Sequence, residues 1–461
     1  KIMSDILWSP DPSQSCEMQQ FMKYVNDEHE LNFDTYEQLY RWSINCGSDF
    51  WASIWKYTNI IHSVPYDEVV DDINRMPGAK WFSGSRMNFA ENLLRYKDEK
   101  LAIQFKGEGQ PVRSLTYKEL YNEVEILASA LRNAGLQEGD RVAGFLPNLP
   151  EAIIAMLATA SIGAIWSASS PDFGIKGVLD RISQIKPKFL FAANGYFYNG
   201  KPFDSLEKLR KILEDLPSVE KVILIPYTED DFDTSKISHA FYYEDFVDRN
   251  NYNSLVFDQL PFNHPLYIMY SSGTTGLPKS IVHSAGGTLI QHLKELKLHV
   301  DLNRDDTIFY FTTCGWMMWN WLVSSLATGA TVVLYDGSPL HPDSSAMWKL
   351  AQDLKITIFG TSAKFITASE AAGERPKQKF DLSKLRSILS TGSPLVDEGF
   401  DYVYRDVKDD VLLASISGGT DLISCFALGN PTLPVHRGEL QCRGLGMAVE
   451  SFDTNGQNQL N

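Results

Sequence analysis

Apolar residues along most of this chain alternate between short strand-like runs and helix-like spacing. Between 117 and 135 they recur every three or four residues, at Leu120, Val124, Leu127 and Leu131. This spacing predicts a helix, and Thr116 is a suitable N-terminal cap. A second helix is predicted over 151–162, and strands are predicted over 141–146, 164–168, 188–192, 222–225, 266–270, 308–312, 331–335 and 357–360. The alternation predicts an α/β fold with parallel sheets covered by helices on both faces.

The two ends of the chain depart from this pattern. Residues 1–100 are rich in aromatic and charged residues, and they predict helices joined by loops that pack on the main body. Helical patterns stop after Gly418, and short strands with Gly and Pro predict a small β sub-domain over about 418–461. The 461 residues are too many for one compact unit, so we expect two or more sub-domains.

Composition narrows the possible partners. Asp and Glu number 58 against 42 Lys and Arg, which gives a net charge of −16 at pH 7. An acidic protein is unsuited to nonspecific binding of nucleic acid or of anionic membranes, so neither is an expected partner. The five scattered cysteines lack metal-binding spacing and predict reduced thiols. With no visible leader and no run long enough to span a bilayer, we expect a soluble, cytoplasmic protein.

One stretch has the residues that a phosphate site requires. It follows the predicted strand 266–270 and contains Ser271, Ser272, Gly273, Thr274, Thr275, Gly276 and Lys279. The glycines allow a tight turn with accessible N–H groups, the hydroxyls add donors, and the lysine adds a positive charge. A plain hydrophilic turn would explain the glycines but not the adjacent hydroxyls. A Walker A loop is excluded, because its second glycine would fall on Pro278.

This stretch resembles the phosphate-binding signature of the adenylate-forming superfamily, which includes acyl-CoA synthetases and luciferases. Two further matches follow in the family's order, at 391–394 and 417–421. The first resembles the turn that lies along the adenine and implies that Gly392, Ser393 and Pro394 bind the nucleotide. The second resembles the segment on the other side of the base and implies contacts from Ser415, Ile416, Ser417, Gly418, Gly419 and Thr420. By resemblance, Thr420 donates to the α-phosphate, Asp421 holds Mg²⁺, and Lys279 completes the catalytic set.

The first hundred residues indicate which branch of the superfamily the chain resembles. Trp42, Trp51 and Trp81 with their neighbours resemble the N-terminal extension of short-chain acyl-CoA synthetases, which implies an AMP-binding domain over 101–461. Acetate enzymes of this family place a Trp two residues before the threonine matched by Thr420, where this chain has Gly418. The missing indole predicts a pocket for a larger acid, although Gly418 could also be a simple turn residue. The resemblance also implies that Trp316, Met317 and Met318 form the opposite wall of the pocket.

The resemblance implies a ligase that uses ATP, Mg²⁺ and coenzyme A, with acetoacetate as the expected acid. Asp172, Phe173 and Lys201 fall where the family contacts coenzyme A, although an ordinary solvated lysine explains Lys201 equally well. The family's ribose-binding Asp and its small C-terminal domain with a catalytic lysine are not found before Asn461, so we expect a fragment of a longer enzyme. Two alternatives stay open. One is an acetyl-, propionyl- or butyryl-CoA synthetase, and the other is a catalytically retired nucleotide-binding protein.

Overall fold

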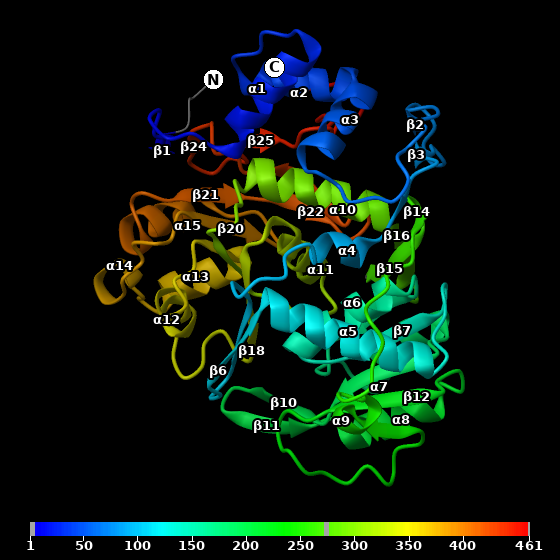
Figure 1. Cartoon of the computed structure of the whole chain (residues 1–461). Coiled ribbons are helices and arrows are strands. Elements are labelled where there is room, and N and C mark those ends of the chain that lie inside the picture. The colour runs from blue at the N-terminus through cyan, green and yellow to red at the C-terminus, as the bar shows by residue number, and fades with distance from the viewer. Residues whose placement is uncertain (1–4, 272–275, 460–461) are drawn as a thin grey trace.

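The computed structural model describes residues 5–271 and 276–459 and contains two seven-stranded sheets (Figure 1). In order across the first sheet, the strands are β13 (Ala240–Tyr242), β12 (Lys221–Ile225), β9 (Phe189–Ala193), β7 (Arg141–Phe145), β8 (Ile165–Ser169), β15 (Pro265–Ser271) and β16 (Lys279–Ser284). In the second sheet they are β21 (Leu412–Ser415), β20 (Ser387–Thr391), β19 (Ile358–Ser362), β17 (Thr307–Tyr310), β18 (Thr331–Asp336), β5 (Leu101–Gly107) and β6 (Val112–Thr116).

Both sheets are parallel except at one edge. In the first sheet only the β15–β16 pair is antiparallel, and in the second only the β5–β6 pair. The predicted strands are confirmed, with ends shifted by one or two residues. Each antiparallel edge is a hairpin, and the loop of the β15–β16 hairpin is the predicted phosphate-binding stretch.

Helices cover both faces of both sheets, as the α/β pattern predicts. One core joins the facing sides of the sheets through α5 (Tyr117–Asn133), α6 (Pro150–Ser161), α10 (Ala285–Lys294) and α11 (Met317–Val323). The outer face of the first sheet packs on α7 (Ile175–Ile185) and α8 (Leu206–Glu214). The outer face of the second packs on α12 (Ala346–Asp353), α13 (Ala363–Ala371) and α15 (Asp397–Tyr402). The fold class is therefore confirmed.

Helix α5 shows how local sequence starts an element. The Thr116 hydroxyl accepts from the backbone N–H of Glu119 at 3.1 Å, and the Glu119 carboxylate accepts from the N–H of Thr116 at 2.8 Å. This reciprocal capping box satisfies backbone donors that the first helical turn leaves unpaired. The predicted helix and its cap are both confirmed.

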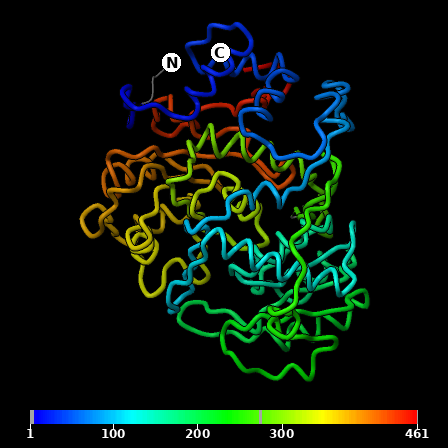
Figure 2. The backbone as a smooth tube through the Cα atoms, viewed as in Figure 1, coloured from blue at the N-terminus to red at the C-terminus, as the bar shows by residue number. Residues whose placement is uncertain are grey.

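The N-terminal segment lies against the end of the chain, and Figures 1 and 2 show these blue and red parts together at one end of the molecule. The segment contains α1 (Glu17–His29), α2 (Tyr36–Asn45), α3 (Gly47–Tyr57), α4 (Phe89–Leu93) and the short strands β1 (Ile6–Trp8), β2 (Glu68–Val70), β3 (Trp81–Ser83) and β4 (Arg86–Met87). Strand β1 pairs with β24 (Val435–His436). The Tyr40 hydroxyl donates to the Met447 carbonyl at 2.9 Å, and the N–H of Gly446 donates to Ser43 Oγ at 2.8 Å.

The C-terminal part forms a small antiparallel sheet. It consists of β22 (Ser417–Gly419), β23 (Ser424–Leu428) and β25 (Cys442–Arg443), in the order β22-β23-β25. Past residue 407 the described part of the chain contains no further helix, as the sequence pattern predicts. Helix α10 and the π-helix η1 (Glu295–His299) that continues it contact this sheet through side-chain hydrogen bonds. Among residues 5–271 and 276–459, no helix combines the length and apolar character that crossing a membrane requires.

Candidate active site

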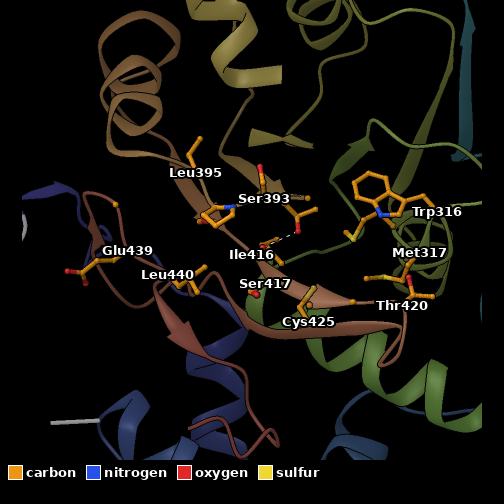
Figure 3. A pocket seen from close by; sticks show the side chains of 18 residues that line it. Trp316, Met317, Ser393, Leu395, Ile416, Ser417, Thr420, Cys425, Glu439 and Leu440 are labelled. Atoms are coloured by element: carbon orange, nitrogen blue, oxygen red, sulfur yellow. Dashed lines mark hydrogen bonds between the residues drawn. The ribbon is translucent and has the colours of Figure 1, made fainter. Parts of the chain in front are cut away.

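One cavity of about 670 Å³ is lined by residues from several parts of the chain. The predicted site residues on its wall come from the start of α11, the residues after β20, and the stretch from the end of β21 to Thr420, just past β22. Twelve of the predicted site residues lie on its wall, namely Trp316, Met317, Met318, Gly392, Ser393, Pro394, Ser415, Ile416, Ser417, Gly418, Gly419 and Thr420. In Figure 3, Trp316 and Met317 lie on one side, Ser393 and Leu395 on the other, and Cys425 lies below Ser417.

The two segments predicted to bind the nucleotide are hydrogen-bonded to each other at the ends of adjacent strands. Strand β20 ends at Thr391, and the chain turns at Gly392, whose φ of +90° lies in the left-handed region that favours glycine. The Thr391 hydroxyl donates to the Ile416 carbonyl at 3.0 Å. Because β20 and β21 are parallel neighbours, their carboxyl ends present both segments at the same edge of the sheet.

The opposite wall is apolar. Trp316 precedes α11, and its ring meets Tyr310 edge-on with centroids 6.0 Å apart. Met317 and Met318, which begin the helix, are buried. This wall therefore suits the carbon chain of a small acid rather than a phosphate.

Two histidines hold the turn that joins β22 to β23 and carries Thr420 and Asp421. His283 Nε2 lies 2.8 Å from the Thr420 carbonyl, and His292 Nε2 lies 2.5 Å from the Ile423 carbonyl. Burial lowers the pKa of His292 to about 4 and also lowers the pKa of His283, so both rings are neutral at pH 7. A neutral imidazole that faces a carbonyl must carry its proton on that nitrogen, so both Nε2–H groups donate. They help to hold Ile423 in a left-handed conformation, with φ of +51°, that a β-branched residue rarely adopts.

Asp421 is exposed and follows Thr420 in the chain; Thr420 lines the cavity, and Asp421 does not. Among the described residues, no group of three or more His, Cys, Asp or Glu side chains could form a metal cage. One exposed carboxylate is enough for Mg²⁺ bound to a nucleotide, because this ion keeps several waters and takes its other ligands from the phosphates. The residues at the turn therefore fit a magnesium–nucleotide complex.

The described residues of the predicted phosphate-binding stretch do not line the cavity. Ser271 pairs with Lys279 across the hairpin, Gly276 and Lys279 are exposed, and Ser272, Gly273, Thr274 and Thr275 fall outside the described residues. Lys279 and His283 are four residues apart on β16, so their side chains share one face of the strand. His283 contacts Thr420, and Lys279 therefore faces the same side as the turn.

The residues predicted to bind coenzyme A are only partly brought together. Asp172 lines a second cavity of about 480 Å³, together with aromatic side chains of β10 (Gly195–Tyr198) and β11 (Lys201–Asp204). Phe173 is exposed and lies under the Arg181 guanidinium, 4.8 Å from the ring centroid. Lys201 is exposed and, like Phe173, is not part of the cavity wall.

Sequence reasoning missed five residues on the wall of the main cavity. They are Leu395, Cys425, Gly438, Glu439 and Leu440. The 438–440 segment is held by Arg437, which donates to Asp401 at 2.7 and 2.8 Å and to Asp397 at 2.6 Å. These ion pairs join residues 36 and 40 positions apart without any motif, so the sequence offered no signal for them.

The steric argument built on Gly418 needs correction. Gly418 lines the cavity, but a Cβ there would lie 2.2 Å from the Ser424 carbonyl oxygen and 2.7 Å from the Cα of Cys425. A side chain at 418 would run into strand β23. A tryptophan therefore cannot fill the pocket on this backbone without displacing that strand. The absence of a side chain is required by the hairpin itself and is no independent evidence for a larger substrate.

We predict that Gly418→Ala lowers the free energy of unfolding by about 1–3 kcal/mol, the usual effect of overpacking. Gly419→Ala is the matched control, because a Cβ at 419 would meet no described atom within 4 Å. Its unfolding free energy should stay within about 0.5 kcal/mol of the parent protein. Urea unfolding of both variants checks this, and equal stability of the two would contradict the close approach of β22 to β23.

Comparison with known proteins shows which family this chain belongs to. Residues 89–435 match the family model described as AMP-binding enzyme, and residues 36–93 match acetyl-coenzyme A synthetase N-terminus. A protein named acetoacetyl-CoA synthetase from Danio rerio is 51% identical over 98% of this chain and 69% of its own length, and the protein of that name from Gallus gallus has the same values. A solved structure titled acetoacetyl-CoA synthetase from Streptomyces lividans superposes with a TM-score of 0.93 at 41% identity, covering 98% of this chain and 71% of that one. The resemblance seen in the motifs is therefore confirmed, and the chain belongs to the AMP-binding enzyme family.

Proposed function

We propose that this protein is an acid–thiol ligase that activates acetoacetate with MgATP and transfers the acyl group to coenzyme A. In the first step a carboxylate oxygen bonds to the α-phosphorus. The bond from that phosphorus to the bridging oxygen of the β-phosphate breaks, and pyrophosphate leaves with the electron pair. In the second step the sulfur of coenzyme A bonds to the acyl carbon. The bond from that carbon to AMP breaks, and the thiol proton passes to solvent.

One observation carries this proposal. A single cavity contains both segments expected to hold the nucleotide and, across from them, an apolar wall of Trp316, Met317 and Met318. Thr420 lies on the same cavity wall as these segments. Holding an acid and the α-phosphate side by side is most of what the first step requires, because it joins two reactants that repel each other in water.

The chain's own residues have distinct roles in the proposed site. The segment 392–394 lies along the base, and 415–419 closes the other side. Thr420 donates its hydroxyl to the α-phosphate, and the loop that ends at Lys279 neutralises the leaving pyrophosphate. Asp421 would hold Mg²⁺, which supplies positive charge to the phosphate oxygens when it is bound. The second cavity, with Asp172 on its wall, is the proposed approach for coenzyme A.

The choice of acetoacetate is supported by the names of the relatives and by the residue types on the apolar wall of the cavity. Both relatives described above are named for acetoacetate. The methionines and the tryptophan give the wall adaptable apolar contact area. In the same proposal, residues 1–100 form the N-terminal extension and 101–461 the AMP-binding domain, with the small β sub-domain beginning at about 418.

Acid-dependent exchange of pyrophosphate into ATP tests the proposal directly in the full protein. We expect kcat/KM for acetoacetate to exceed that for acetate by more than about tenfold, since filling an apolar pocket contributes about 1–3 kcal/mol per methylene. Propionate and butyrate should fall below acetoacetate. If kcat/KM for acetate, propionate or butyrate exceeds the value for acetoacetate, that acid is the substrate instead. ATP binding without exchange for any acid would indicate a retired enzyme.

Replacing Lys279 with Ala should reduce exchange by more than about tenfold, because a charge-assisted contact to phosphate contributes about 1.5–3 kcal/mol. Lys279→Arg keeps the charge and should retain more activity than the alanine variant. Initial rates at saturating acid and varied ATP provide the comparison. Wild-type rates in the alanine variant would remove Lys279 from the phosphate site.

A further inference from the structure

A carboxylate that the proposed mechanism does not use lies directly behind the cavity. Glu295, at the junction of α10 and η1, is fully buried. Its Oε1 accepts from Ser424 Oγ at 2.7 Å, from the N–H of Cys425 at 3.0 Å and from Gln291 Nε2 at 3.1 Å. Its Oε2 accepts from the indole N–H of Trp321 at 2.8 Å. A buried carboxylate is expensive to desolvate unless its lone pairs are filled, and here both oxygens are occupied.

Two of these donors lie on elements that carry different walls of the cavity, β23 and α11. Cys425, on β23, lines the cavity and gives its backbone N–H to Oε1. Trp321 lies on α11, one turn after Met317 and Met318, and therefore on the same side of that helix. The Glu295 carboxylate thus connects strand β23 to helix α11, which carries the apolar wall of the cavity. In Figure 3, Met317 lies beside Trp316, and Cys425 lies below Ser417.

The neighbouring cation, Lys294, lies at ion-pair distance from this carboxylate but is not hydrogen-bonded to it. Lys294 Nζ lies 3.8 Å from Oε1 and makes no hydrogen bond to any described residue. Burial lowers the pKa of the Lys294 ammonium group. The short contacts of Glu295 are therefore all to uncharged donors on the two walls and on α10, so its geometry is set by those walls.

We propose that Glu295 is a positioning residue that fixes the width of the acyl end of the cavity and thereby helps to select the acid. The inference rests on the proposed function, since it requires that the acid binds between α11 and β23. If Glu295 only stabilised the fold, its loss would affect all substrates alike. If it sets the width, its loss changes the preference among acids of different size while ATP, which contacts other residues, is bound as before.

Glu295→Gln in the full protein is the first test. The amide keeps the shape, and its oxygen can still accept from Ser424 and Cys425, but its NH₂ then faces the indole N–H of Trp321, donor against donor. We expect the ratio of kcat/KM for acetoacetate over acetate to fall by about fivefold or more, with KM for ATP changed by less than about twofold. Ser424→Ala, which removes one donor, should shift the ratio in the same direction by a smaller factor.

A double-mutant cycle separates positioning from general destabilisation. Trp321→Phe removes the indole donor, so its effect on the acid ratio should be smaller in the Glu295→Gln background than in the parent, giving non-additive effects. Trp319→Phe is the matched control, because its indole, also buried on α11, donates to Asn148 Oδ1 at 3.0 Å and not to Glu295. The effects of Trp319→Phe and Glu295→Gln should be additive.

The possible results distinguish failure of the proposed function from failure of the positioning role. A parent protein that activates no acid contradicts the proposed function itself. An active parent with an unchanged acid ratio in folded Glu295→Gln, confirmed by thermal unfolding and ATP binding, contradicts the positioning role. If Glu295→Gln fails to fold, the ratio in Ser424→Ala and Trp321→Phe decides, and an unchanged ratio in both overturns the proposal.

Discussion

The hairpin of β22 and β23 depends on hydrogen bonds from side chains that α10 and η1 bury behind it. His292 donates to the carbonyl of Ile423, and Glu295 accepts from Ser424 and Cys425. The hairpin carries Thr420 and Asp421, and its first strand approaches the second so closely that only glycine fits at 418. In a water-excluded interior these bonds are strong, and an unmade one would be costly. The turn is therefore held in one conformation before any ligand binds.

In the proposed site, that arrangement brings two anions together. The carboxyl ends of β20 and β21 present backbone and hydroxyl groups on the wall proposed for the nucleotide, while α11 presents the apolar wall proposed for the acid. The hairpin lies between them and is fixed from behind by one helix. In the proposed site, His283 and His292 hold the turn that carries Thr420, while Glu295 joins strand β23 to α11. Both parts are held in place before a ligand binds, so the proposed chemistry needs little further rearrangement of the protein.

Much of this could be predicted from the sequence, because local patterns determine it. The period of apolar residues located α5 and the parallel strands, and Thr116 with Glu119 marked the helix start. The site segments at 391–394 and 415–420 were found through their resemblance to motifs of the adenylate-forming superfamily, and the structure places them on one cavity wall. The direction in which a side chain at Gly418 would point was not predictable. It depends on how closely β23 approaches, which is a tertiary property. The same applies to Arg437 with Asp401 and to Glu295 with Cys425, since residues far apart in the chain meet there without a motif.

The central claim is that one cavity holds the nucleotide and the acid on facing walls. A crystal structure of the protein with a non-hydrolysable acetoacetyl-adenylate analogue tests this most directly. The account predicts the adenine against Gly392–Pro394, the phosphate mimic within hydrogen-bond distance of Thr420, and the acyl group between Trp316 and Cys425. An acyl group pointing away from α11, or an analogue bound in the cavity lined by Asp172, would contradict it.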